Sequence, residues 1–387
     1  MWLLVLITLA GTLAMHMFVP ALPDAAQQLD ASSSQAQLTI TVYIIGLGLG
    51  QLIYGPLSDS LGRRPMLIVG LSLYTVAGIG AFFAPTMEAL IALRLLQALG
   101  GCAGLALGRA VVRDTASPGT TVSKLALLNL MVMLGPGVAP AIGSYIDSLL
   151  GWRAIFAALA LMGGITLLGV CLLLTETGHP TGELHARTIG HDYHSLLSTP
   201  SFVCFAVGGG CATTAFYAFI SAAPFIFIHQ LGASKQAVGL YLGVVMMGLA
   251  AGNALARSLI RRWSIDRLMV LGNGLCLVSA TSFVLQVLAG VLTAEGVMAS
   301  MVGFTIGSGM TSPAALTRAL GVHPELTGSA AGMYGCLQMA IGGLCTLAAS
   351  IGHNPALSAS VVLLVTSVIS AWGFREGIRH PYIPKTA

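Results

Sequence analysis

The sequence predicts an all-α membrane protein with about twelve transmembrane helices, arranged in two pseudo-symmetric six-helix bundles. Three observations support this fold class. Hydrophobic residues make up 56% of the 387 residues and charged residues only 8%, against about 25% charged residues in a typical soluble domain. The apolar residues form long runs instead of short alternating segments, which excludes an outer-membrane β-barrel. The longest polar connector lies near the middle of the chain, so it divides the helices into two groups of six.

Composition also excludes several classes of function. The 17 basic and 13 acidic side chains are too few to cover the surface of a soluble enzyme of this length. The net charge is only +4 and the basic residues are not clustered, so we expect no nucleic-acid partner. The seven cysteines lie in apolar runs and form no C-x-x-C pair, so we expect no metal, cofactor or disulfide. No G-x-x-x-x-G-K-[ST] segment occurs, which disfavours an ATP-driven pump.

Twelve apolar runs are separated by polar residues, glycine and proline, and a spanning helix needs about 20 mostly apolar residues. The centres of these runs lie near residues 12, 47, 75, 98, 134, 164, 212, 246, 278, 304, 339 and 365. The first run has no basic segment before it and no cleavage site, so we expect it to be retained as a helix. We expect an N-terminal bundle over residues 1–176, a cytoplasmic linker over 177–200 and a C-terminal bundle over 201–387.

The distribution of basic residues predicts the orientation. If the N-terminus is inside, the inner connectors hold 13 of the 17 lysines and arginines, and the outer connectors hold only Arg153 and Lys235. Basic residues accumulate on the cytoplasmic side of membranes. We therefore expect both termini in the cytoplasm and a multi-pass protein in the bilayer of a bacterial-type inner membrane.

A weak internal repeat relates the two halves. The segment that begins at Gly50 resembles the segment that begins at Gly252, and the same offset relates Gly70 to Gly272. Parallel repeats of this kind are typical of transporters built from two similar bundles.

The segment GPLSDSLGRR carries the sharpest functional pattern. Gly55 would let a neighbouring helix approach closely, and Gly62 would permit a tight turn between two helices. Asp59 lies at a helix end, where the helix dipole disfavours an acid unless nearby cations compensate, and Arg63 and Arg64 can supply them. We expect these five residues to form a polar latch that breaks and re-forms between two conformations. A simple basic turn is the alternative.

The fourth span holds Arg94, Gln97 and Arg109. Arg94 would lie about 12 Å inside the span at 1.5 Å per residue. An unpaired arginine at that depth is costly, so we expect it to face a water-filled cavity or a partner. The alternative is that its side chain extends to the outer interface, and the same alternative is stronger for Arg109, which lies nearer the cytoplasm.

The fifth span contains a dense set of helix-bending residues: Gly135, Pro136, Pro140 and Gly143. Proline and glycine bend and thin a helix, so two bundles could pack and pivot here. Tolerated kinks are the alternative, since both residue types are common in membrane spans.

These three patterns together resemble the Bcr/CflA branch of twelve-helix drug:proton antiporters in the major facilitator superfamily. The first is similar to the superfamily signature between helices 2 and 3, and the others to the helix 4 pattern and the helix 5 antiporter motif. The resemblance implies a monomeric secondary transporter that exports small amphipathic, drug-like compounds by alternating access in exchange for protons. The alternatives are a dedicated exporter of a metabolite (siderophore, sugar or amino acid) and a non-transporting receptor on the same fold.

His16 departs from that branch. Its members usually carry an aspartate near the end of helix 1, which is taken as the proton-binding site, and His16 stands at this position here. Histidine titrates near neutral pH. Three interpretations remain open: His16 binds the coupling proton opposite Arg94, coupling has shifted or been lost and His16 bonds to substrate or backbone, or His16 is structural.

Tyr43, Tyr217 and Gln338 are further residues that we expect to line the substrate cavity together with Arg94 and Gln97. Aromatic walls with a few polar groups suit amphipathic compounds. Lipid-facing or packing positions are the alternative for each of the three.

Overall fold

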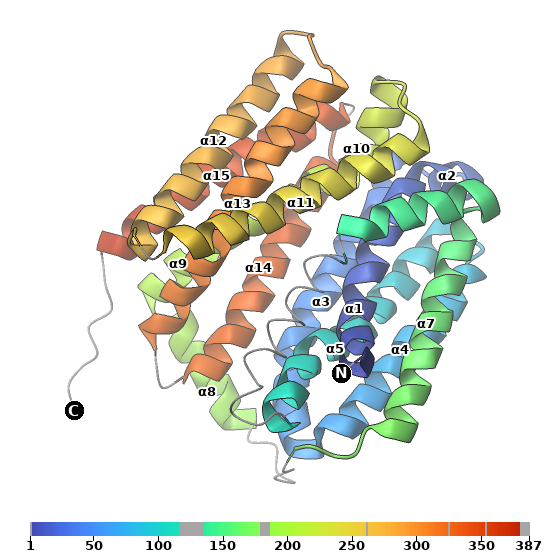
Figure 1. Ribbon diagram of the computed structural model, residues 1–387, viewed down its shortest axis with the longest axis vertical. Helices are drawn as coiled ribbons and strands as arrows, with labels where there is room; N and C mark the ends of the chain where they lie inside the picture. The colour runs from blue at the N-terminus through green and yellow to red at the C-terminus, as the bar shows by residue number, and fades with distance from the viewer. Residues whose placement is uncertain are drawn as a thin grey trace. The chain divides into compact units, whose positions relative to one another are not determined.

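The computed structural model describes residues 2–115, 135, 137–178, 186–260, 262–323, 326–352 and 354–379. Every regular element in this part of the chain is a helix (Figure 1). The chain divides into two compact units, and each is described by itself. The division into bundles at residues 177–200 remains a prediction.

The first unit comprises Met1–Leu184 and Ala223–Gly243. Its helical elements are α1 (Trp2–Met17), η1 (Val19–Ala21), α2 (Leu22–Gln28), α3 (Ser33–Leu61), α4 (Arg63–Phe82), α5 (Met87–Thr115), a helix over 137–150, α7 (Trp152–Leu173), η2 (Phe225–Gln230) and the start of α11 (Lys235–Leu259).

The second unit comprises His185–Ala222 and Val244–Ala387. It contains the rest of α11 and the elements α8 (Ala186–Leu197), α9 (Pro200–Thr214), α10 (Phe216–Pro224), α12 (Ile265–Leu288), α13 (Ala294–Val322), α14 (Thr327–Ala349) and α15 (Pro355–Arg379). Within this unit, α12 packs against α13 and α15, and α9 packs against α13, α14 and α15.

The predicted spans are confirmed as helices. Ten helical segments of the described residues are long and apolar enough to cross a membrane. The tenth predicted span corresponds to α13, which has 29 residues, and the described part of the fifth is the helix over 137–150. Eleven of the twelve predicted centres lie in helices, and the centre near residue 134 lies outside the described residues.

The first span is a continuous helical segment with an internal change of geometry. α1 ends at Met17, a short 3-10 turn follows over Val19–Ala21, and α2 begins at Leu22. Pro20 and Pro23 lie in this stretch, and proline lacks the backbone N–H that a regular helix would use. His16 is the second-last residue of α1, so its side chain lies just before this change of geometry.

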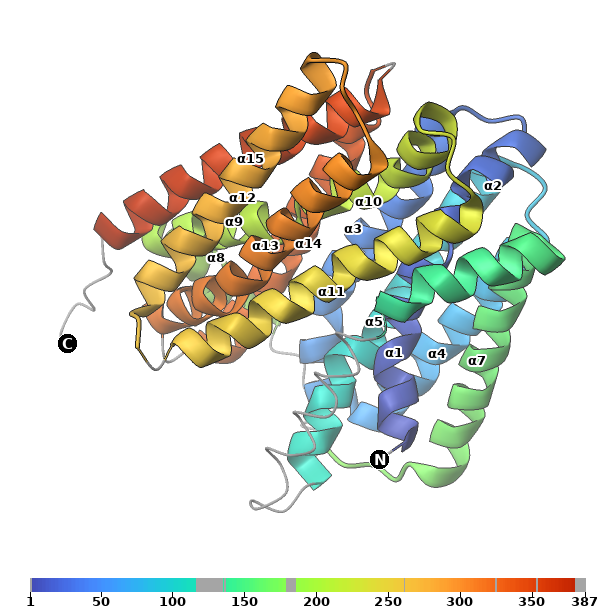
Figure 2. The same ribbon diagram turned by 45° about the horizontal axis from the view of Figure 1, so that its top comes forward.

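α5 is the centre of the first unit, where it packs against α1, α3 and α4 (Figure 2). Small residues allow this packing. A side chain at Gly104 would collide with the backbone carbonyl of Ile7, so α1 and α5 touch through their backbones.

The internal repeat has a structural counterpart in each unit. A Cβ at Gly70 on α4 would collide with the Cβ of Ala103 on α5. A Cβ at Gly272 on α12 would collide with Oγ1 of Thr311 on α13. The two glycines thus permit the same kind of close helix contact, one in each half of the chain.

Candidate functional site

The turn between α3 and α4 is built on Gly62. Its φ of 102° lies in the region that favours glycine, and its N–H donates to the carbonyl of Ser58 at 3.0 Å. This turn ends α3 and starts α4 one residue later. Asp59, three residues before Gly62, and Arg63, the residue after it, therefore lie within reach of each other.

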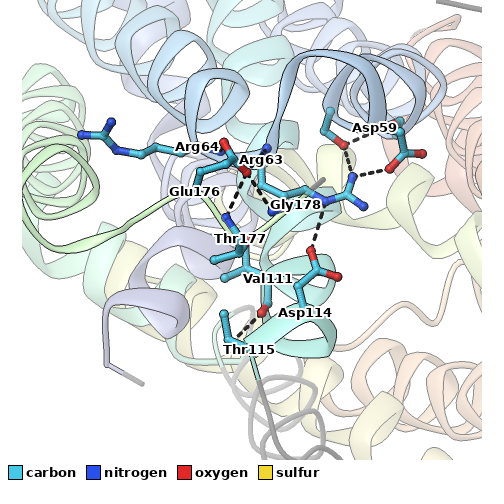
Figure 3. Close-up of polar contacts among 11 residues, drawn as sticks. Asp59, Arg63, Arg64, Val111, Asp114, Thr115, Glu176, Thr177 and Gly178 are labelled. Carbon is cyan, nitrogen blue, oxygen red and sulfur yellow. Dashed lines mark hydrogen bonds and ion pairs between the residues drawn. The ribbon is translucent and has the colours of Figure 1, made fainter. Parts of the chain in front are cut away.

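Arg63 connects three side chains at this end of the first unit (Figure 3). Its Nη1 lies 2.6 Å from Oδ1 of Asp59 and also donates to Oγ of Ser58. Its Nε donates to Oδ2 of Asp114, at the end of α5, at 3.3 Å. One guanidinium thus ties α3 and α4 to α5 through charge-assisted hydrogen bonds.

Glu176, three residues after the end of α7, completes this cluster. Its Oε1 accepts from the backbone N–H of Arg63 at 2.9 Å, and its Oε2 from that of Arg64 at 3.1 Å. Thr177 and Gly178 also donate their N–H groups to Oε1. A carboxylate therefore satisfies the first N–H groups of α4, at the positive end of its dipole (Figure 3).

Two of the predicted latch residues lie differently from the prediction. Arg64 points away from Asp59, and its Nη2 donates to the carbonyl of Cys171 on α7 at 2.9 Å (Figure 3). A Cβ at Gly55 would meet no described atom within 4 Å, so this part of the structure shows no close helix approach there. Asp114 and Glu176 join this cluster from distant helix ends, so no local sequence pattern points to them.

Arg94 is fully buried in the first unit, so its side chain does not extend to an interface. Its Nη1 donates to Oε1 of Gln97 at 2.8 Å. The guanidinium carbon lies 4.0 Å from the ring centroid of Tyr43, and the rings of Phe18 and Phe156 lie 5.6 and 5.7 Å away. The expected partner of this cation is therefore a set of aromatic faces and one amide.

Tyr43 is buried and also forms a hydrogen bond to α1. Its hydroxyl donates to the carbonyl of Gly11 at 2.7 Å, and Tyr74 on α4 donates similarly to Ala10 at 3.1 Å. These two bonds join α3 and α4 to α1. Arg94 thus packs on a ring that is itself fixed to α1.

His16 is 2% exposed, at the end of α1. Its Nδ1 donates to the carbonyl of Thr12 at 2.9 Å. His16 and Arg94 are both buried in the first unit, and the expectation that they face each other remains a prediction. Arg109 is exposed on the surface of α5.

The described part of the fifth span packs closely against its neighbours. A Cβ at Gly143 would collide with the carbonyl of Met17, and the carbonyl of Pro140 borders Gly239 on α11. Gly135 borders Leu9. Pro136 lies outside the described residues.

Gln338 lies in a polar cluster of the second unit. Its Nε2 donates to Oγ1 of Thr213, and its carbonyl accepts from Oγ1 of Thr214 at 2.9 Å. Tyr217 is half-buried and packs against Phe216, with ring centroids 4.4 Å apart. The cluster lies where α9 ends and α10 begins, so a break in the seventh span coincides with polar side chains.

Comparison with known proteins decides the family. The sequence matches the Major Facilitator Superfamily over residues 4–347. The chain belongs to this superfamily. Superfamily members are multi-pass secondary transporters of small-molecule substrates and not enzymes, and the geometry above is that of one member.

Similar proteins include transporters from several bacteria. The chain is 30% identical to an uncharacterized MFS-type transporter, YdgK of Bacillus subtilis (strain 168), over 96% of this chain and 94% of the relative. It is also 30% identical to a chloramphenicol resistance protein of Pseudomonas aeruginosa, over 85% and 78% of the two chains. A bacterial homolog of the human lysosomal transporter Spinster, in an inward-facing and occupied conformation, has the same fold with a TM-score of 0.77 and 15% identity, over 98% and 96% of the chains.

Proposed function

We propose that this superfamily member belongs to the Bcr/CflA branch and exports small amphipathic compounds across a bacterial plasma membrane, in exchange for protons. The Asp59–Arg63–Asp114 cluster carries the proposal. Its charge-assisted bonds are partly exposed, so water can replace them at modest cost when the helix ends separate. Alternating access needs contacts of this kind, which hold one conformation and are lost in the other.

The type of substrate is inferred from the relatives and from the side chains. A chloramphenicol resistance protein is 30% identical to this chain, which supports a drug-like compound. Tyr217 and Gln338 are half-buried aromatic and polar groups of the kind that bind such compounds. We propose that these residues contact the substrate, and that the chain works as a monomer with both termini in the cytoplasm.

The coupling proton is assigned to His16 in this proposal. A free imidazole has an ordinary pKa near neutral pH, and His16 is buried in the same unit as Arg94. Gln97 and Tyr43 hold Arg94 in place. Binding of the proton beside a fixed cation is unfavourable, so a small movement of α1 relative to α5 would change the proton affinity of His16.

Accumulation of a compound panel in efflux-deficient cells tests the proposal. The panel contains amphenicols, bicyclomycin, quinolones and cationic dyes, each measured with and without a protonophore. We expect the wild-type protein to lower accumulation of at least one compound, and the protonophore to abolish this effect. An Arg63→Ala protein in the membrane at equal amount serves as the control with a broken latch. Unchanged accumulation across the panel would contradict drug export and favour a dedicated metabolite exporter.

A further inference from the structure

Two carboxyl groups and one ammonium group meet at the predicted outer end of the first unit. They belong to Asp24 on α2, Asp147 on the helix over 137–150, and Lys235, the first residue of α11. Nζ of Lys235 contacts Oδ2 of Asp24 and lies 3.8 Å from Oδ2 of Asp147. Three segments that are far apart in the sequence thus share one charge cluster.

Asp147 is the unusual member of this cluster. Its side chain is 0% exposed, whereas those of Asp24 and Lys235 are 24% and 36% exposed. Neither of its carboxyl oxygens accepts a hydrogen bond from an N–H or hydroxyl group of the described residues. A buried carboxylate that is ionised and accepts no hydrogen bond is energetically costly.

Protonation removes this cost. Asp147 lies past the outer end of the fifth predicted span, and burial and the neighbouring Asp24 carboxyl raise its pKa, which Lys235 offsets only in part. The carboxyls of Asp24 and Asp147 can bond to each other only when one of them carries a proton. Asp147 would then donate to Asp24, while Asp24 keeps its ion pair with Lys235.

Three other titratable or charged groups near this end are directed away from Asp147. Arg153 on α7 donates to Oε1 of Gln28 and to the carbonyl of Ala84. His16 on α1 donates to the carbonyl of Thr12, and Tyr145 on the same helix as Asp147 is 64% exposed. Asp24 and Lys235 are therefore the groups that act on the Asp147 carboxyl.

The burial of Asp147 depends on the packing of α11. Oγ of Ser144 donates to the carbonyl of Lys235 at 2.8 Å. A Cβ at Gly239 would meet Ser144, and a Cβ at Gly243 would lie 2.7 Å from the carbonyl of Gly137. The first three turns of α11 thus touch the helix over 137–150 through small groups, and separation of the two helices would admit water to Asp147.

We propose that Asp147, with Asp24 and Lys235, is a proton-binding latch that holds the start of α11 against the helix over 137–150 when Asp147 is protonated. The packed form binds the proton more tightly than a separated form in which water solvates Asp147. By linkage, the packed form is favoured at low pH and is lost as the pH rises. The proton comes from the outer water and returns to it, so this proton is distinct from the one assigned to His16.

The role of the Asp147 latch in transport rests on the proposed function. An exporter that has released its substrate outside must close its outer side before it can return for the next molecule. A proton taken up from the outer side by Asp147 would favour this closure. The latch would then make the return step faster at low external pH.

A distance measurement across the contact tests the latch without any substrate. Tyr145 and Leu240 are 64% and 61% exposed, one on each helix, so spin labels on cysteines at these positions are expected to be tolerated. The seven native cysteines are replaced, and the labelled protein is placed in phospholipid nanodiscs. Distance distributions are then recorded by pulsed electron paramagnetic resonance between pH 5 and pH 8.

We expect the population with the short distance to fall as the pH rises. The ratio of the two populations should change by up to about tenfold for each unit by which the pKa of Asp147 differs between the forms. Asp147→Asn, which stays neutral and can still donate to Asp24, should keep the short distance at every pH. Asp24→Asn removes the neighbouring carboxylate and should move the midpoint to lower pH.

Asp30→Asn is the matched control, because Asp30 is an exposed acid just after α2, and it should titrate like the wild type. A wild-type distance that does not change with pH overturns the latch, and so does an Asp30→Asn protein that loses the dependence. Transport that ignores a protonophore, together with an intact pH-dependent distance, would contradict the proposed proton exchange and leave the latch supported.

Discussion

The carboxylate of Glu176 accepts a hydrogen bond from the backbone N–H of Arg63 at 2.9 Å, so a residue beyond α7 caps the first turn of α4. The side chain of the same arginine bonds to Asp59 and Asp114. Arg63 is thus held at both its backbone and its guanidinium. The ends of four helices (α3, α4, α5 and α7) depend on this one residue.

Glu176→Gln should lower the stability of the protein. The amide keeps one acceptor oxygen but loses the negative charge and one of the two acceptors at the start of α4. Loss of a helix cap costs about 1 kcal/mol, and we expect a loss of this size in detergent. Thermal unfolding of Glu176→Gln and of the control Asp30→Asn measures it, and equal transition temperatures for the two variants would contradict the role of the cap.

The stabilisation by Glu176 should persist down to mildly acid pH. Burial acts to raise the pKa of Glu176, but the N–H groups of Gly178, Arg63, Arg64 and Thr177 outweigh it, so the pKa lies below its ordinary value of 4.5. A lowered pKa in the folded protein gives stability that is complete above the ordinary value and is lost as the pH falls through the lower one. The difference in unfolding temperature between wild type and Glu176→Gln should therefore stay constant from pH 7 to about pH 5. A difference in unfolding temperature that disappears near pH 6 would contradict the lowered pKa of Glu176.

Arg63 and Arg64 should differ in their effect on transport. The side chain of Arg63 bonds to two carboxylates, whereas the side chain of Arg64 donates to a backbone carbonyl. We expect Arg63→Ala to slow transport roughly tenfold, equivalent to about 1.4 kcal/mol, and Arg64→Ala to slow it much less. Initial rates in vesicles with equal amounts of protein measure both. Equal losses of transport rate in the two variants would show that transport depends on the positive charge of this turn and not on the specific bonds of Arg63.

Arg94 and Tyr43 should be energetically coupled. The guanidinium lies 4.0 Å from the Tyr43 ring centroid, and a desolvated cation–π contact is worth about 1–2 kcal/mol. A double-mutant cycle with Arg94→Met and Tyr43→Leu should give a coupling free energy of about this size in unfolding experiments. The Arg94–Phe156 pair, at 5.7 Å, is the matched control and should couple less. A coupling near zero for both pairs would mean that Gln97 alone stabilises the cation.

The positions of the helices could be predicted from the sequence because each span requires a long apolar run, and the run shows in the sequence itself. Asp59, Gly62 and Arg63 can be recognised for a similar reason, since they lie within one short turn, and their use as a polar latch stays a prediction. Asp114 and Glu176 could not be found in this way. Their partners are 51 and 113 residues away, and only the packing of helix ends brings them together.

The surroundings of Arg94 were not predictable either. From the sequence we expect a water-filled cavity or a partner of unknown type beside Arg94. The structure surrounds this cation with the rings of Phe18, Tyr43 and Phe156. These rings come from the residue after α1, from α3 and from α7, and follow no common spacing. Asp147 is a similar case, because its burial depends on α11, which begins 88 residues later and brings Lys235 beside it.

Proton movement in proteoliposomes tests the central claim of proton exchange most directly. A pH-sensitive dye is enclosed in the vesicles, and a gradient of a compound that the accumulation panel identifies is then imposed. We predict that protons move against the flow of the compound and that His16→Gln abolishes this movement. His229→Gln, which changes an exposed histidine, should leave it intact. Flow of the compound without proton movement in the wild-type protein would contradict proton exchange.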